Sequence, residues 1–333
     1  MYALQTTALC KTFYSKRKRE GLAGSIRALL KPEWEEKRAV VDIDLSVRRG
    51  ETVAFLGPNG AGKSTTIKML TGILHPSSGH AEVLGFVPWR ERTQLAFQIG
   101  AVFGQKSQLW YHLPPIDTFE LLSRIYELNR HDYIQRRNDL IERFELGAYL
   151  HTPVRKLSLG ERMRCEIAAS FLHRPKLLFL DEPTIGLDVV IKQQIRQLIR
   201  TLNREEGTTV FLTSHDAGDV EELCTRAVVI HHGGLLLDQK VDRLHQEVLN
   251  QKVVSLLVKP GSVISPTIPG VSVSAQDERS YKLVVDLSRT NMEQVLGAVI
   301  AQAAIEDLTI ENPPMEEIIQ HIYGMKGGGA GDE

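Results

Sequence analysis

The chain has 333 residues, enough for one large domain and a second, smaller one. Its 40 lysine and arginine residues nearly balance its 41 aspartate and glutamate residues, and the net charge of -1 gives no reason to expect a nucleic-acid partner. No apolar stretch reaches the roughly 18 residues of a membrane span, and the first residues lack the apolar core of a signal peptide. We therefore expect a protein that stays in the cytosol.

The first predicted element is a strand over residues 2–10, where apolar and polar side chains alternate loosely. Phe13 and Tyr14 follow near its end. An aromatic ring at this place can stack on an adenine ring if a phosphate-binding loop follows later in the chain. Taken alone, such a ring is more often part of a hydrophobic core, so both interpretations stay open.

Residues 15–38 form a distinct basic segment. It opens with four basic residues at positions 16–19, and apolar residues then recur at helical spacing up to Leu30, before Pro32. One interpretation is an amphipathic hairpin that covers its own domain and carries a solvated basic run. The other is a basic amphipathic helix that lies against an anionic membrane surface or a membrane partner.

Residues 57–65 contain the motif around which the other predicted elements are arranged. They fit the spacing G-x-x-x-x-G-K-[ST], after an apolar strand predicted over residues 52–56 and before a predicted helix. Glycines let backbone N–H groups turn toward a phosphate, and the helix N-terminus adds unpaired donors and a positive dipole. We expect Lys63 to contact the β- and γ-phosphates and the Ser64 hydroxyl to bind Mg²⁺. A glycine-rich turn with a chance lysine is the alternative.

Further strands are predicted over residues 39–47, 79–87 and 99–103, and Gln105 follows the last of them. A glutamine at a strand end is ordinarily a surface residue, but its carbonyl oxygen can coordinate Mg²⁺ and respond to the γ-phosphate. From residue 116 to about residue 149, apolar side chains recur at helical spacing. This pattern predicts an inserted helical subdomain.

Ser158 precedes a helix that the sequence predicts up to Leu172. Ser158 can cap this helix, and Glu161, three residues later, completes a capping box. Such a box needs no ligand, yet it leaves the helix N-terminus free to bind an anion.

Asp181 and Glu182 end an apolar strand that begins near residue 176. Acidic residues at the end of a buried parallel strand lie at the sheet edge where such folds bind ligands. Asp181 can hold Mg²⁺ through water, and Glu182 can accept a proton from an attacking water. His215 ends another predicted strand, over residues 209–215, and could donate to the γ-phosphate, although a lone histidine is usually only a polar surface residue.

From about residue 251 the pattern predicts a small α+β domain. Its strands are expected over residues 253–258, 271–273, 281–285 and 305–310, with a helix after a capping box at residues 290–293 and a last helix from Pro313.

These motifs, in this order, make residues 2–240 similar to the ATP-binding subunit of an ABC transporter. Residues 57–65 match its Walker A motif, Gln105 its Q-loop, residues 157–161 its signature, residues 177–181 its Walker B motif, Glu182 its catalytic acid, residues 185–188 its D-loop with Asp188, and His215 its switch histidine. By this resemblance the nucleotide contacts Phe13, with Tyr14 a close rival, and Gly57, Asn59, Gly60, Gly62, Lys63, Ser64 and Thr65. Magnesium ligands would be Ser64, Gln105 and Asp181. Signature residues Ser158, Gly160 and Glu161 would face the nucleotide of a second subunit.

Two of the motifs depart from the family pattern, at three residues in all. The signature has Leu159 where glycine is commonest and Glu161 where glutamine is, and the D-loop has Ile185 where serine is usual. The signature variants resemble those of ABC-2 type exporters, including drug and viologen exporter ATPases. So does the stretch with Gln108, Leu109 and Trp110, which such subunits offer to a membrane permease.

The resemblance implies an α/β fold: a P-loop ABC ATPase domain with a RecA-like core, an antiparallel β subdomain and a helical subdomain, plus a C-terminal α+β domain. The expected boundaries are residues 1–245 for the ATPase domain, with the basic insertion at 15–38 and the helical subdomain at 106–160. Residues 246–325 would form a regulatory or dimerisation domain, or a packing module without a ligand, and residues 326–333 a flexible tail.

The resemblance implies that the chain hydrolyses ATP with Mg²⁺ and thereby energises a separate ABC-2 type permease. The expected direction of transport is outward, and the expected substrate is a drug, a lipid-like molecule or another small molecule. Two ATP molecules would be enclosed in a head-to-tail dimer of identical or paralogous subunits at the cytoplasmic face of the cell membrane. The alternative is a non-transport ABC ATPase that acts as a switch on another protein complex.

Overall fold

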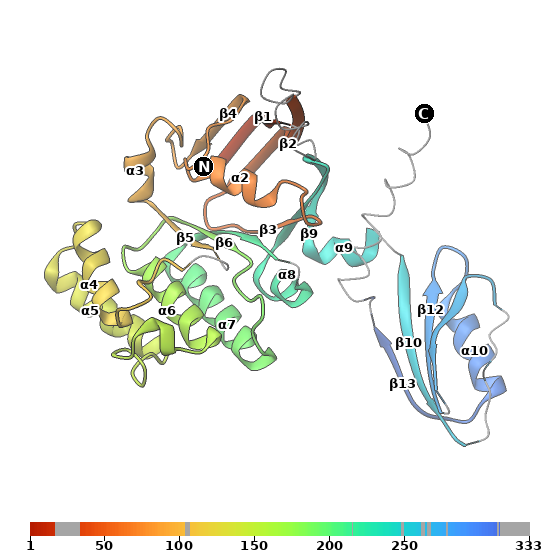
Figure 1. The fold of residues 1–333 in the computed structure, drawn as a ribbon. Helices are drawn as coiled ribbons and strands as arrows, with labels where there is room; N and C mark the ends of the chain where they lie inside the picture. The colour runs from red at the N-terminus through yellow and green to blue at the C-terminus, as the bar shows by residue number, and fades with distance from the viewer. Residues whose placement is uncertain are drawn as a thin grey trace, which may run out of the picture. The chain divides into compact units, whose positions relative to one another are not determined.

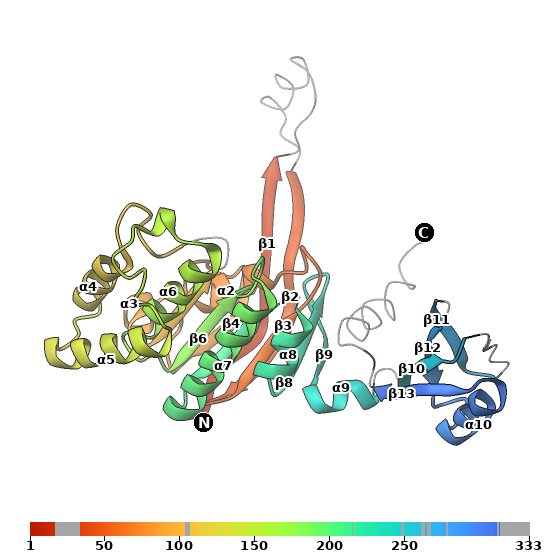
Figure 2. The same ribbon diagram turned by 90° about the horizontal axis from the view of Figure 1, so that it is seen from below.

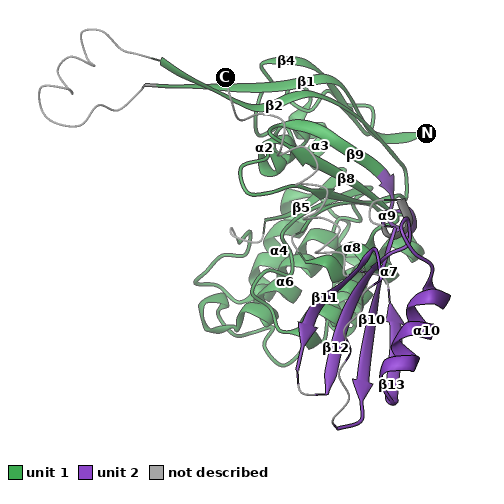
Figure 3. Ribbon diagram, turned by 90° about the vertical axis from the view of Figure 1, so that its right-hand side faces the viewer, with its two compact units in different colours: residues 1–238 green, residues 239–333 purple. Residues whose placement is uncertain are grey.

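A computed structural model of the chain describes residues 1–16, 34–103, 107–214, 216–247, 250–260, 264, 268–277, 279–311 and 313. The chain divides into two compact units, residues 1–238 and residues 239–333 (Figure 3). The boundary expected from the sequence, after residue 245, falls within helix α9 (Val241–Glu247).

A six-stranded sheet forms the centre of the first unit, with the strand order β5-β6-β7-β3-β8-β9 (Figure 1). Its strands are β3 (Thr52–Leu56), β5 (Ile99–Phe103), β6 (Leu177–Asp181), β7 (Thr209–Thr213), β8 (Arg226–His231) and β9 (Gly234–Lys240). The pairs β5–β6, β6–β7, β7–β3 and β3–β8 are parallel. β3 and β7 are buried throughout, as expected of parallel strands covered on both faces. The carboxyl ends of these strands therefore meet at one edge, where ligands bind in such folds.

A second sheet of the first unit is antiparallel, with the order β2-β1-β4, and its strands are β1 (Tyr2–Lys16), β2 (Trp34–Arg48) and β4 (Ser78–Val83). The strands predicted over residues 2–10 and 39–47 were too short, because pairing continues to Lys16 opposite Trp34. Residues 34–38 are exposed, so they lack the alternation by which a half-buried strand is recognised. Figure 2 shows these strand ends projecting beyond the rest of the first unit.

The strand predicted over residues 79–87 was too long, because β4 ends at Val83 in a turn closed by the hydrogen bond from Val83 N to Phe86 O, at 2.9 Å. Residues 17–33, which contain the helical pattern of the basic segment, lie outside the described residues.

Helix α2 (Lys63–Leu70) packs in a core shared by the two sheets. Ile67, Met69 and Leu70 contribute to one hydrophobic cluster with Leu4 and Ile43 of the antiparallel sheet, and with strand residues of the central sheet. Burial of apolar side chains on both sides fixes the helix axis, and with it the direction of the helix N-terminus.

The remaining helices of the first unit are α3 (Arg92–Ala96), α4 (Pro115–Ile125), α5 (Arg130–Arg143), the 3₁₀ turn η1 (Val154–Lys156), α6 (Leu159–Phe171), α7 (Val189–Glu206) and α8 (Ala217–Leu223). Figure 1 shows α4 and α5 together at one end of the unit, in the helical region that the sequence predicts. Arg136 of α5 is buried and donates to Phe171 O (3.2 Å) and Glu206 Oε2 (2.9 Å), and so joins α5 to α6 and α7.

The second unit, after α9, contains an antiparallel sheet with the order β11-β12-β10-β13 and one described helix, α10 (Met292–Gln302). The strands are β10 (Gln251–Val258), β11 (Val271–Gln276), β12 (Ser280–Asp286) and β13 (Ile305–Glu311). The capping box predicted at residues 290–293 was wrong by one residue, because Asn291 caps α10 by accepting from Gln294 N at 2.8 Å. The last predicted helix begins at Pro313, and all its residues from 314 on lie outside the described residues.

Candidate nucleotide-binding site

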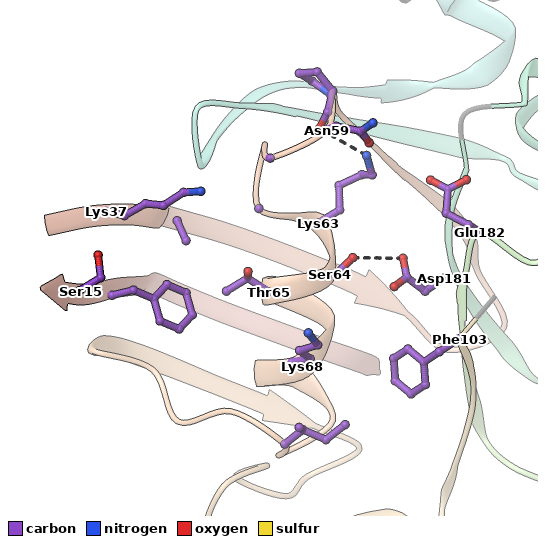
Figure 4. A pocket seen from close by; sticks show the side chains of 16 residues that line it. Ser15, Lys37, Asn59, Lys63, Ser64, Thr65, Lys68, Phe103, Asp181 and Glu182 are labelled. Atoms are coloured by element: carbon purple, nitrogen blue, oxygen red, sulfur yellow. Dashed lines mark hydrogen bonds between the residues drawn. The ribbon is translucent and has the colours of Figure 1, made fainter. Parts of the chain in front are cut away.

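A cavity of about 640 Å³ lies where the phosphate-binding loop meets the ends of β1, β2, β5 and β6 (Figure 4). Its lining comes from segments far apart in the sequence: Phe13, Ser15, Lys37, Ala39, Pro58, Asn59, Gly60, Gly62, Lys63, Ser64, Thr65, Lys68, Ile73, Phe103, Asp181 and Glu182. Most of the predicted nucleotide and metal ligands are therefore neighbours in space. The volume falls within the range of roughly 300–1,000 Å³ usual for small-molecule pockets.

Two glycines of the loop are fixed by close backbone approach. Gly62 has φ of +108°, and a Cβ added there would lie 2.4 Å from Ala39 O. A Cβ at Gly57 would lie 2.6 Å from Ile230 O. Any larger residue would push the loop away from β2 or β8, so these glycines hold the loop against its neighbours.

Lys63 is the first residue of α2 and is 7% exposed. Its Nζ donates to Gly57 O at 2.5 Å and to Pro58 O at 3.4 Å, which holds the ammonium at the loop. Burial lowers the pKa of Lys63, and the charges of Glu182 and Asp181 act in the opposite direction. A lysine kept in this place carries a charge that phosphate oxygens can compensate.

Asp181 closes the opposite wall, at the end of β6. Its Oδ1 accepts from Thr213 Oγ1 at 2.6 Å. It also accepts from Ser64 Oγ at 3.5 Å (Figure 4). A hydroxyl and a carboxylate at this separation are the hard oxygen ligands that Mg²⁺ takes beside a nucleotide. The residues therefore fit a magnesium ion between α2 and β6.

Glu182 turns its carboxylate into the same cavity through an unusual backbone conformation. Its φ is +56°, in the left-handed region, and its N–H donates to Thr213 O at 3.0 Å. A non-glycine residue in this region costs about 1–3 kcal/mol, and such residues cluster at active sites. The hydrogen bond to β7 holds the strained residue in place.

The structure distinguishes the two aromatic residues at the end of β1. Phe13 lines the cavity together with Lys37, its partner on β2, whereas Tyr14 is not among the lining residues and is 63% exposed. Neighbouring strand residues point to opposite faces, so only one of the two rings faces the cavity. Lys11 Nζ lies over the Phe13 ring, 5.3 Å from the ring centroid.

Replacing Phe13 with alanine is expected to weaken ATP binding by about 5- to 150-fold, since stacking of a base on an aromatic side chain contributes about 1–3 kcal/mol. Tyr14→Ala is the matched control, and its affinity should stay within about twofold of the wild type. Fluorescence titration with a labelled ATP analogue measures both. Equal losses in the two variants would contradict the assignment of Phe13 to the base.

The signature residues cap α6. Ser158 Oγ accepts from Glu161 N at 3.3 Å, and Glu161 Oε2 accepts from Ser158 N at 2.8 Å, which is the capping box that the sequence predicts. A Cβ at Gly160 would lie 3.1 Å from Ile191 Cγ2, so this end of α6 adjoins α7. Asp188 caps α7, accepting from Ile191 N at 3.0 Å. None of these residues lines the described cavity.

Gln108, Leu109 and Trp110 do not form one exposed surface. Leu109 is 3% exposed and belongs to the core, which corrects the prediction that it faces a permease. Trp110 is 52% exposed, and Tyr111, which the sequence analysis missed, is 56% exposed. Gln105 and His215 lie outside the described residues.

Asp219 is a fully buried carboxylate that the sequence analysis also missed. It accepts from Thr184 Oγ1 at 2.5 Å, from Ser214 Oγ at 2.6 Å and from Arg196 Nε at 2.7 Å. It thus joins the chain just after Glu182 to the end of β7. In the sequence it is one acidic residue of a short helix, and nothing in its spacing indicates burial.

A phosphate loop at a helix N-terminus, with two carboxylates opposite it at a parallel sheet edge, defines a P-loop nucleotide-binding protein. The chain matches the family described as ABC transporter over residues 40–185. It is 34% identical over 226 residues to the ABC transporter ATP-binding protein NatA of Bacillus subtilis (strain 168), a match that covers 67% of this chain and 92% of that protein. The chain belongs to the ABC transporter ATP-binding proteins and is an ABC transporter ATPase.

A second relative is the daunorubicin resistance ATP-binding protein DrrA3 of Streptomyces coeruleorubidus, 32% identical over 299 residues, which cover 87% of this chain and 93% of that protein. Among solved structures, the chain resembles the ATP-binding cassette MJ0796, solved as a dimer in a post-hydrolysis state bound to ADP and Pi. The TM-score is 0.60 at 24% identity, and the match covers 72% of this chain and 98% of that one. These findings confirm the family and the cassette fold that the sequence predicts.

Proposed function

We propose that this ATPase energises a separate ABC-2 type permease and that the transport is export of a drug, a lipid-like molecule or another small molecule. The observation that carries the catalytic part is the single cavity that unites Lys63, Asp181 and Glu182. Support for export comes from the daunorubicin resistance relative. Its match covers 87% of the chain, and because the first unit ends at residue 238, it has to include part of the second unit.

In this proposal the residues of the cavity divide the work of hydrolysis with Gln105 and His215, whose roles follow from the family resemblance alone. Lys63 and the loop N–H groups hold the β- and γ-phosphates, and Phe13 stacks on the adenine. Ser64 and Asp181, with Gln105, hold Mg²⁺, which supplies positive charge to the phosphate oxygens when bound. Glu182 orients a water and takes its proton, and His215 contacts the γ-phosphate.

A second subunit completes each site. Ser158 and Gly160 lie at an α6 N-terminus that does not line the described cavity of its own chain, so they are available to a nucleotide held by another copy. Asp188 lies beside them at the start of α7. The partner is a second copy or a paralogous ATPase, and the second unit contributes to dimer contact or regulation.

The membrane partner is proposed to bind around Trp110 and Tyr111, two exposed aromatic rings between β5 and α4. Exposed aromatic residues are enriched in protein interfaces. Within the described ranges no helix is both long and apolar enough to span a bilayer. We propose that the chain lies at the cytoplasmic face of the cell membrane, held there by its permease.

Co-purification from native membranes tests the transporter function. A Glu182→Gln variant, kept in its ATP-bound form, is isolated with Mg²⁺ and ATP, and the proteins that accompany it are identified by mass spectrometry. A polytopic membrane protein is the expected companion. A soluble complex in its place would favour the alternative function, a switch that regulates another protein assembly.

Trp110→Asp is expected to reduce recovery of the permease by about tenfold or more, because buried aromatic contacts commonly contribute 2 kcal/mol or more to an interface. ATP affinity should be unchanged, since Trp110 does not line the cavity. Trp34→Asp, at a tryptophan that is 60% exposed on β2, is the matched control. Full recovery of the permease with Trp110→Asp would exclude this surface.

A further inference from the structure

Glu166 is a buried carboxylate in the middle of α6, the helix that begins with the signature residues. It is 4% exposed and does not line the nucleotide cavity. Burial raises the pKa of Glu166, while hydrogen bonds from Ser107, Gln108 and Leu109 act in the opposite direction. A carboxylate is retained in such a place only when donors satisfy it, so the identity of its donors is informative.

All these donors come from one short segment that follows β5. Glu166 accepts from Ser107 Oγ, from Gln108 N at 3.1 Å and from Leu109 N at 3.5 Å. In return, Gln108 Nε2 donates to Glu166 O at 2.9 Å. Three consecutive residues are therefore attached to one turn of α6, through both its side chain and its backbone.

The segment also has hydrogen bonds of its own. Ser107 Oγ accepts from Leu109 N at 3.1 Å, and the Leu109 side chain is buried. The single hydroxyl hydrogen of Ser107, which can point to Glu166, has Leu109 O at 3.2 Å as its alternative acceptor. This local turn does not depend on Glu166. Changing Glu166 is therefore expected to detach the segment from α6 rather than to unfold it.

Trp110 is the next residue along the chain, and its backbone N–H donates to Thr118 Oγ1 of α4 at 3.4 Å. Its ring is exposed, as described above. Because Ser107, Gln108 and Leu109 are bonded to Glu166, a displacement of α6 would carry these residues, and with them the exposed ring. The contacts join the middle of α6, the helix that begins with the signature residues, to the surface proposed to bind the permease.

We infer that Glu166 is a positioning residue that fastens residues 107–109 to the signature helix, so that ATP-dependent movement of α6 changes the position of Trp110. The inference rests on the proposed function, because it uses the ATP-dependent closure of two subunits. It assigns no chemical step to Glu166. The coupling is mechanical, because one buried carboxylate links the helix that responds to the nucleotide to the surface proposed to bind the permease.

The chain contains three tryptophans, so Trp110 can be made the only one by replacing Trp34 and Trp89 with phenylalanine. In a Glu182→Gln background, Trp110 emission is recorded while Mg²⁺ and ATP are added, and ATP affinity and dimer formation are measured in parallel. We expect Glu166→Gln to lose at least about half of the ATP-dependent emission change while it retains ATP affinity and the ATP-bound dimer. The glutamine side chain has the same size as glutamate, but its NH₂ group is a donor. That group would therefore face donor groups of residues 107–109 and could not accept hydrogen bonds from them.

Two further variants complete the test. Ser107→Ala, which removes one of the donors, should reduce the emission change in the same direction. Glu145→Gln is the matched control, because Glu145 also contacts α6, through Arg164 at 3.4 Å, but from an exposed position outside the segment. Its emission change should equal that of the parent.

An unchanged response in Glu166→Gln, or the absence of an ATP-dependent response in a parent that binds ATP and dimerises, would overturn the inference. So would loss of ATP affinity in Glu166→Gln, because Glu166 would then act on the nucleotide site. Failure of the parent itself to bind ATP or to dimerise would instead count against the proposed function. The two kinds of failure are therefore distinguishable.

Discussion

Glu182→Gln is expected to lower ATP turnover by a factor of about 10²–10⁴, the usual contribution of a positioned general base. Glutamine has the same shape and can still orient a water, but it cannot take the proton. ATP affinity should therefore persist, and the ATP-bound dimer should accumulate. Phosphate release under multiple-turnover conditions measures the first effect, and size-exclusion chromatography with Mg²⁺ and ATP measures the second.

The left-handed backbone of Glu182 offers a second variant. Glycine at φ of +56° removes the carboxylate and also the backbone strain, which costs about 1–3 kcal/mol. Glu182→Gly should lose turnover as Glu182→Gln does, while its free energy of unfolding stays equal to or above that of the wild type. Loss of activity without loss of stability would separate chemistry from folding.

Glu127 supplies the matched control for both variants. It is an exposed glutamate after α4 with a φ of +51°, so it shares the backbone conformation but not the cavity. Glu127→Gln should leave turnover unchanged within about twofold. Turnover near the wild-type level in Glu182→Gln would rule out Glu182 as the base.

The sequence predicted the buried parts of the fold well. β3, β5, β6 and β7 are short apolar runs next to motif residues, and each was expected at or near its observed bounds. Their side chains are apolar because both faces of a parallel sheet are covered, so composition alone reveals them. The phosphate loop was equally clear, because its glycines and lysine are required by a short-range geometry.

Contacts between residues far apart in the chain could not be predicted from the sequence in the same way. The exposed continuation of β1 and β2 has no burial pattern, and pairing between strands distant in sequence defines it. The resemblance placed Leu109 on a stretch offered to a permease, but its side chain is buried and its N–H donates to Glu166, far along the chain, at 3.5 Å. A buried carboxylate is recognised by its donors, and those are known only when the chain is folded.

The choice between Phe13 and Tyr14 illustrates the limit for the site. A strand has two faces, and a shift of one residue exchanges them. The family resemblance favoured Phe13, with Tyr14 a close rival, but the sequence alone did not show which of the two rings faces the nucleotide. The register of β1 against β2, in which Phe13 pairs with Lys37, assigns Phe13 to the cavity.

Lys63→Met is expected to weaken MgATP binding by about 10- to 150-fold, since a hydrogen bond to a charged group contributes about 1.5–3 kcal/mol. Methionine has nearly the same length but neither charge nor donors. The nucleotide-free protein should respond in the opposite direction. Burial lowers the pKa of Lys63, which means that the folded chain bears a cost for keeping this ammonium charged, and methionine removes that cost.

The melting temperature of nucleotide-free Lys63→Met should therefore equal or exceed that of the wild type, by about 2–4 °C for each kcal/mol gained. Added MgATP should raise the melting temperature of the wild type much more than that of the variant, because only tight binding stabilises the folded state. Lys68→Met, at an exposed lysine of the same helix that lines the cavity, is the matched control. A melting temperature of nucleotide-free Lys63→Met well below that of the wild type would contradict this account. The lysine would then be needed to hold the loop together. The loss of ATP binding would follow from a disordered loop and not from a missing phosphate contact.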